Sequence, residues 1–134
     1  MAGKTVDFEA VQAAIDAFAS GEVERIVRHV HEDFEGVVPP SMSAEPDDYR
    51  GHDGVRRYFD LWRESIDDLQ FRSHVIEECC GWVLAALHVT GVGRTSGVPV
   101  DLDAVAAIQM RDGKLARMVG YPSLEEARAG VSER

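Results

Sequence analysis

The fold of this protein is indicated most clearly by residues 100–121, which read VDLDAVAAIQMRDGKLARMVGY. Residues 100–110 are rich in apolar and small side chains, as is typical of a strand, and residues 115–121 form a second such run. Between the two runs, Asp112 and Gly113 are a strong hairpin signal because both tolerate the positive φ of a type I′ turn. The stretch therefore predicts two antiparallel strands joined by a tight turn.

Two further strands are predicted before this hairpin, and a helix is predicted after it. Residues 69–75 alternate apolar and polar side chains, and residues 82–92 are β-rich. After the hairpin, Ser123 and Glu126 match a capping box, which predicts a short terminal helix. We expect residues 130–134 to fray.

Three helices are predicted in the first half of the chain. Apolar side chains recur three and four residues apart over residues 8–18, 23–30 and 55–66. A short strand is expected at 34–38, and residues 39–49 are expected to be a loop because they contain three prolines. Helices followed by a meander predict an α+β fold with the helices on one face of the sheet. The other face is then either solvated or covered by a partner.

Composition limits the functional classes. The 134 residues fit one domain, 1–134, and contain 24 acidic residues against 14 lysines and arginines, for a net charge of −10. Such a charge disfavours nucleic acid and anionic membranes, because both are bound through cationic contacts. No apolar run approaches the ~20 residues of a membrane helix, and the N-terminus lacks a signal-peptide core. We therefore expect a cytoplasmic protein.

Cysteine and histidine spacing favours neither a disulfide framework nor a metal. The only cysteines, Cys79 and Cys80, are adjacent in sequence, so we expect two reduced thiols near a turn. His29 and His31 have no further ligands at suitable spacing. We expect no metal and no cofactor.

Three local patterns, in this order, cover nearly the whole chain: SGEV at 20–23 followed by HEDF at 31–34, YRGHDGV at 49–55, and RDGKL at 111–115 followed by Tyr121 and EEA at 125–127. In this respect the chain resembles the SnoaL-like branch of the nuclear transport factor 2-like superfamily. The resemblance implies a cone-shaped domain in which N-terminal helices pack on a curved, mainly antiparallel sheet and enclose a pocket. It also implies a homodimer formed through the convex sheet face.

The resemblance does not transfer an activity, because the acids of the enzymatic members are missing. The three polar groups of the ketosteroid isomerases fall near Ala14, Val38 and Ala106. The acids of the limonene-epoxide hydrolases fall near residues 87–89 and at Gly120, and the acid or histidine of the polyketide cyclases falls near Gly120 and Ser123. Catalytic residues therefore stay unassigned, with Tyr49 and Asp33 as the remaining candidates. The alternatives are that the Tyr49 ring packs under the third helix and that Asp33 turns the chain after a helix.

The pocket wall that the resemblance implies is apolar. Large side chains stand beside small ones, which would leave space for a hydrophobic, ring-bearing molecule. The expected ligand-binding residues are Phe18, Val38, Tyr49, Phe59, Trp62, Leu87, Val89, Ala104, Ala106 and Met118.

Three functional hypotheses follow. The first is a homodimeric protein that binds a small hydrophobic molecule resembling a polyketide, steroid or terpene. The second is an enzyme of the cyclase, isomerase or dehydratase type with an acid that the motifs do not reveal. The third is an interaction module that binds another protein through its convex sheet face.

Overall fold

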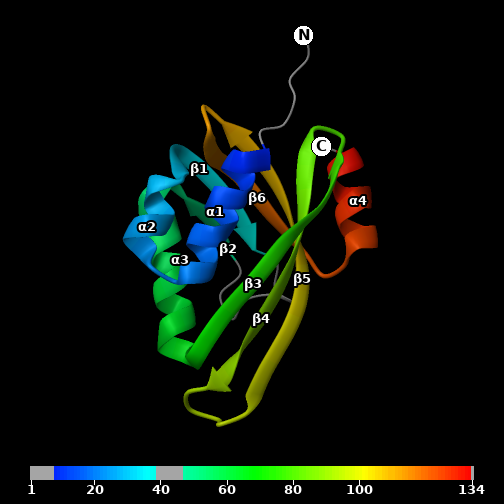
Figure 1. Ribbon diagram of the computed structural model, residues 1–134. Coiled ribbons are helices and arrows are strands. Elements are labelled where there is room, and N and C mark those ends of the chain that lie inside the picture. The colour runs from blue at the N-terminus through cyan, green and yellow to red at the C-terminus, as the bar shows by residue number, and fades with distance from the viewer. Residues whose placement is uncertain (1–7, 39–46, 134) are drawn as a thin grey trace.

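The computed structural model describes residues 8–38 and 47–133, which form four helices and a six-stranded sheet (Figure 1). In chain order the elements are α1 (Phe8–Ser20), α2 (Val23–Arg28), β1 (Val30–Val38), β2 (Asp47–Arg50), α3 (Gly51–Ser65), β3 (Ile66–Cys79), β4 (Trp82–Gly93), β5 (Pro99–Arg111), β6 (Lys114–Tyr121) and α4 (Leu124–Ser132). The strand order is β2-β1-β6-β5-β4-β3, and only the β1–β6 pair is parallel. The predicted α+β class is confirmed.

The hairpin that the sequence predicts most strongly is present. Asp112 and Gly113 have φ values of 55° and 75°, as a type I′ turn requires. Residues on one face of β5 and β6, such as Ala106 and Met118, point toward α1 and α3, and their neighbours Ala107 and Val119 belong to a second buried cluster. This alternation follows from the two-residue period of a strand.

The sheet is covered on both faces, which corrects the expectation of helices on one face only. The main core lies between the sheet and α1, α2 and α3, whereas α4 packs on the opposite face (Figure 1). There, Ala127 and Val131 are buried against Trp82 and Leu84. Val131 is 2% exposed, so fraying from residue 130 onward is wrong within the described residues. The reason is that Ala127 and Val131 are four residues apart and share one helical face.

Three predicted boundaries are also corrected. Val30 was expected in a helix but opens β1, where it pairs with Leu115 of β6. Residues 47–49 were expected in a loop but form β2 against the end of β1; residues 39–46 of that loop lie outside the described residues. Ile66 was expected on the third helix but begins β3. For Val30 and Ile66, strand pairing overrides the local apolar period. For residues 47–49, pairing with β1 overrides the loop signal of the prolines.

None of the described helices is both long and apolar enough to cross a membrane.

The predicted capping box at the start of α4 is present, and its removal should weaken the fold. The Ser123 hydroxyl oxygen accepts a hydrogen bond from the backbone N–H of Glu126 at 3.2 Å. We expect Ser123→Ala to lower the free energy of unfolding by about 1 kcal/mol, because one N–H of the helix loses its partner. Urea denaturation measures the change, and Ser132→Ala at the other end of the helix is the comparison. Equal stability of Ser123→Ala and the unchanged protein would contradict this prediction.

Candidate functional site

An apolar cavity lies inside the main core, between α3, the end of α1 and the inner face of the sheet. Its volume is about 60 Å³. The wall combines aromatic rings with small residues of the central strands. The lining residues are Phe18, Phe34, Gly36, Val37, Tyr49, Val55, Tyr58, Phe59, Leu87, Ala106, Met118 and Gly120.

The small residues explain why space remains at this point of the core. Ala106 of β5 pairs with Ala85 of β4 on one side and with Gly120 of β6 on the other. In this row, each of the three neighbouring strands therefore has a side chain no larger than a methyl group. Larger side chains from the same strands, for instance Leu87 and Met118, line the same cavity.

Aromatic rings of α1 and α3 form the helix side of the cavity. Phe59 is 1% exposed and makes edge-to-face contacts with Phe18, Tyr58 and Phe71, with centroid distances of 5.4, 5.6 and 5.5 Å. Such pairs favour this geometry because the positive edge of one ring meets the negative face of another. The cluster fixes α3 and α1 against the strands.

Tyr49 is held in the wall by a close approach of β2 to α3. Gly54 of α3 has no side chain, and a Cβ there would lie 2.8 Å from the carbonyl carbon of Tyr49. The Tyr49 ring is buried, meets Tyr58 at 5.2 Å and has the Arg57 guanidinium 4.5 Å from its centroid. The packed ring that was the alternative for Tyr49 is therefore present in the structure.

Tyr58 is a polar residue of the wall that the sequence did not single out. Burial raises the pKa of Tyr58 to about 12, although the neighbouring Trp62 opposes part of that rise. The hydroxyl therefore stays protonated at neutral pH and is a hydrogen-bond donor. Trp62 is next to it, and its indole N–H is buried without a hydrogen-bond partner among the described residues.

The structure brings six of the ten predicted pocket residues to the cavity: Phe18, Tyr49, Phe59, Leu87, Ala106 and Met118. Val89 and Ala104 are buried farther along the same sheet face and do not line it. Trp62 lies behind the wall, against Tyr58 and Phe71. The side chain of Val38 is outside the described part of the structure. Tyr58 was missed because its spacing matches the ordinary apolar stripe of α3.

A second void of about 20 Å³ lies deeper in the core. Phe18, Leu87 and Met118 line both spaces and separate them. Met118 has three rotatable side-chain bonds beyond Cα and adapts readily to its surroundings. A rotation of this one side chain would therefore enlarge the main cavity toward the second void.

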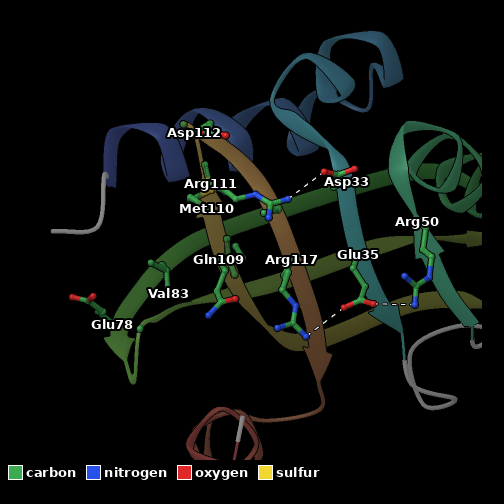
Figure 2. Close-up of a pocket in the computed structure, with 14 residues that line it drawn as sticks. Asp33, Glu35, Arg50, Glu78, Val83, Gln109, Met110, Arg111, Asp112 and Arg117 are labelled. Carbon is green, nitrogen blue, oxygen red and sulfur yellow. Dashed lines mark ion pairs between the residues drawn. The ribbon is translucent and has the colours of Figure 1, made fainter. Parts of the chain in front are cut away.

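A much larger hollow, about 880 Å³, lies on the α4 side of the sheet and is open to solvent (Figure 2). Several of its charged side chains form ion pairs: Arg117 and Arg50 pair with Glu35 at 3.4 and 3.0 Å, and Arg111 pairs with Asp33 at 3.6 Å. Exposed pairs like these contribute little energy and are screened by salt. Size alone therefore does not make this groove the better candidate, because it is open to solvent and most of its charged side chains are paired.

Asp33, one of the two catalytic candidates, lies in this open groove and not at the apolar cavity. Its carboxylate is 73% exposed and faces Arg111 and His31. Asp33 lies within strand β1, so it neither caps nor turns the chain. The two candidates, Tyr49 and Asp33, are thus not brought together.

The chemistry available at the cavity is limited by its wall. None of the described lining residues is an aspartate, glutamate or histidine, so none of them could act as a general base at neutral pH. Tyr58 could donate a hydrogen bond to an oxygen and stabilise negative charge there. Within the same described residues, no three histidine, cysteine or acidic side chains gather in a way that could hold a metal ion.

The comparisons with known proteins agree with this architecture. The model of the SnoaL-like domain family matches residues 11–118, so the chain belongs to the SnoaL-like domain family. The resemblance seen in the sequence is confirmed. None of the curated proteins matches the chain significantly.

Solved structures show the same fold at low sequence identity. TerC, co-crystallised with polyporic acid, is 23% identical with a TM-score of 0.71, over 93% of this chain and 97% of TerC. A putative polyketide cyclase from Xanthomonas campestris pv. campestris is 24% identical with a TM-score of 0.70, over 92% of this chain and 95% of the cyclase. A hypothetical protein with a ketosteroid isomerase-like protein fold from Catenulispora acidiphila, in complex with trimethylamine, is 14% identical with a TM-score of 0.69, over 94% of this chain and 95% of that protein. At these identities the likeness shows the fold alone.

Proposed function

We propose that this chain, as one domain, binds a small hydrophobic molecule in the cavity between α3 and the sheet, and that the Tyr58 hydroxyl donates a hydrogen bond to an oxygen of that molecule. The observation that carries the proposal is the partly buried Tyr58, whose hydroxyl is protonated at neutral pH, in a wall that is otherwise apolar except for Tyr49. Binding sites of small molecules combine such walls with a few polar groups that fix orientation. The polyporic acid bound by TerC supports the same ligand class for this fold.

The ligand must open the cavity before it can enter. A volume of about 60 Å³ is well below the ~300–1,000 Å³ of ordinary ligand sites. The thin partition formed by Phe18, Leu87 and Met118 offers one way to gain room. Binding should therefore be accompanied by a movement of side chains, with Met118 as the most adaptable of the three.

The test is a thermal-shift screen of the purified protein against steroids, aromatic polyketides, terpenes and fatty acids. A ligand at about 100 times its dissociation constant adds about 2.7 kcal/mol to the free energy of unfolding. For a chain of this length, that corresponds to a rise of several degrees in the melting temperature. If no member of any class raises the melting temperature, the proposal for this ligand class fails.

Replacing Tyr58 by phenylalanine tests the polar contact. Tyr58→Phe keeps the ring and removes only the hydroxyl, so we expect ligands with a carbonyl oxygen to lose about 0.5–1.5 kcal/mol of binding free energy. A hydrocarbon analogue of the same shape should bind the two proteins equally. Isothermal titration with both ligands measures the difference. An equal loss for both ligands would instead mean that the substitution disturbs the cavity as a whole.

An enzyme of the cyclase type is the second candidate. The buried hydroxyl of Tyr58 favours it, because a donor in an apolar site can stabilise an enolate oxygen. Turnover would then rest on positioning, since the described wall provides no base. Loss of substrate conversion in Tyr58→Phe without a matching loss of binding would support this candidate.

A cytoplasmic location and a homodimer stay predictions. The described residues expose only two large apolar side chains, Ile76 and Val98. A dimer through the α4 side of the sheet would therefore be formed largely by polar contacts. Because the described residues expose so few large apolar side chains, no exposed apolar patch among them supports the hypothesis of an interaction module.

A further inference from the structure

The turn between β3 and β4 places the two cysteines at the tip of a hairpin. Cys79 ends β3, and Cys80 and Gly81 form the turn with φ values of 58° and 83°. Two successive positive φ values are those of a type I′ turn. Figure 1 shows this turn beside the C-terminal end of α4, where Ser132 lies.

The two thiols lie on the same side of the turn and are accessible. The Sγ atoms of Cys79 and Cys80 are 3.4 Å apart, and the Cys80 Sγ is 3.6 Å from the Ser132 Oγ. The Ser132 Oγ also lies 2.8 Å from the backbone oxygen of Arg128. Cys79 is half-buried and Cys80 is exposed. A reagent in solution can therefore reach both sulfur atoms.

The positions of the two thiols favour bonding of both sulfur atoms to one third atom over a disulfide bond between them. Adjacent Cα atoms joined by a trans peptide are ~3.8 Å apart, whereas disulfides usually join Cα atoms ~4.4–6.8 Å apart. A bond between the two thiols would therefore be strained. Two thiolates on one tetrahedral centre with bonds of ~2.3 Å are ~3.8 Å apart, and a narrower bond angle brings them closer. The observed separation of 3.4 Å is of this kind.

The surroundings also favour stepwise ligation. Hydrogen bonding with Ser132 and with Cys79 lowers the pKa of the Cys80 thiol, whereas hydrogen bonding with Cys80 raises the pKa of the Cys79 thiol. Cys80 is therefore the first of the two to react as a thiolate. The Arg128 Nε donates to Glu77 at 3.0 Å, so this neighbouring cation is already paired.

We propose that Cys79 and Cys80 together form a binding site for one soft, thiophilic centre, of which a trivalent arsenical is the simplest representative. Soft centres prefer thiolate ligands. With phenylarsine oxide, two sulfur–arsenic bonds form and two S–H bonds break. The oxide oxygen leaves as water with both protons, so arsenic stays trivalent and no oxidant is needed.

The test uses the reduced full chain and phenylarsine oxide, with the adduct followed by intact mass. We expect one adduct per chain, formed with loss of water. Glutathione, a monothiol, is then added in increasing concentration to displace it. The adduct of the unchanged protein should need at least about tenfold more glutathione than that of Cys79→Ser or Cys80→Ser, because the second thiol of a pair acts at a high effective concentration.

Val98→Ala is the matched control, because Val98 is exposed and precedes β5, away from the turn between β3 and β4. It keeps both thiols and Ser132 and should keep the resistance to glutathione. Circular dichroism establishes that each variant is folded. Release of arsenic from the unchanged protein at the same glutathione concentration as from the single-thiol variants would overturn the proposal. So would a protein that forms no adduct after reduction.

Discussion

Phe59→Ala is expected to lower the free energy of unfolding by about 3–5 kcal/mol. Phe59 is 1% exposed and joins rings from α1, α3 and β3, so the substitution removes the centre of the aromatic cluster. Because the total stability of a domain is about 5–15 kcal/mol, the variant should retain only part of it. Urea or thermal denaturation measures the loss.

The same substitution should create a site for a small aromatic molecule. Phe59 lines the cavity, so its removal joins the volume of the ring to the existing space. Apolar cavities of that size stay dry and bind benzene. We therefore expect benzene to raise the melting temperature of Phe59→Ala and to leave the unchanged protein unaffected.

Val98→Ala is the control for Phe59→Ala, because Val98 is 59% exposed. Truncation of an exposed side chain should change the stability by no more than about 0.5 kcal/mol. A loss below about 1 kcal/mol in Phe59→Ala would contradict the central position of this ring in the core.

The sequence predicted the fold wherever local signals and tertiary contacts agree. The turn at Asp112 and Gly113 and the cap at Ser123 depend on neighbouring residues only, and both are present. The sequence failed where a distant partner decides the structure. Val30 continues the apolar stripe of α2, yet it pairs with Leu115 of β6, and no local pattern near residue 30 reveals that strand.

The site was harder to predict than the fold. The small residues Ala106 and Gly120 indicated where space remains, because alternation along each strand shows which side chains share a face. The role of Tyr58 depends on its burial and on the neighbouring Trp62, and helical spacing alone does not distinguish a pocket tyrosine from a core residue. The sequence also suggested Asp33 as a catalytic residue. It did not show that the position of Asp33 in β1 directs this side chain toward the open groove.

Ala106→Val is expected to abolish ligand binding while the protein stays folded. Ala106 is 1% exposed and lies between Ala85 and Gly120, so two added methyl groups would extend into the cavity. Valine also favours a strand. We therefore expect a stability within about 1 kcal/mol of the unchanged protein, together with loss of the thermal shift produced by any ligand found in the screen.

Ala104→Val separates cavity filling from a general effect of valine on β5. Ala104 lies two residues away on the same face and is buried, but it does not line the cavity. Its valine variant should keep the ligand-induced shift, which at about 100 times the dissociation constant is worth about 2.7 kcal/mol. If Ala106→Val retains the full shift, the ligand binds elsewhere, and the open groove beside Arg117 becomes the next place to test. If both variants lose the shift, valine on β5 disturbs the sheet, and Tyr58→Phe remains the decisive variant for the cavity.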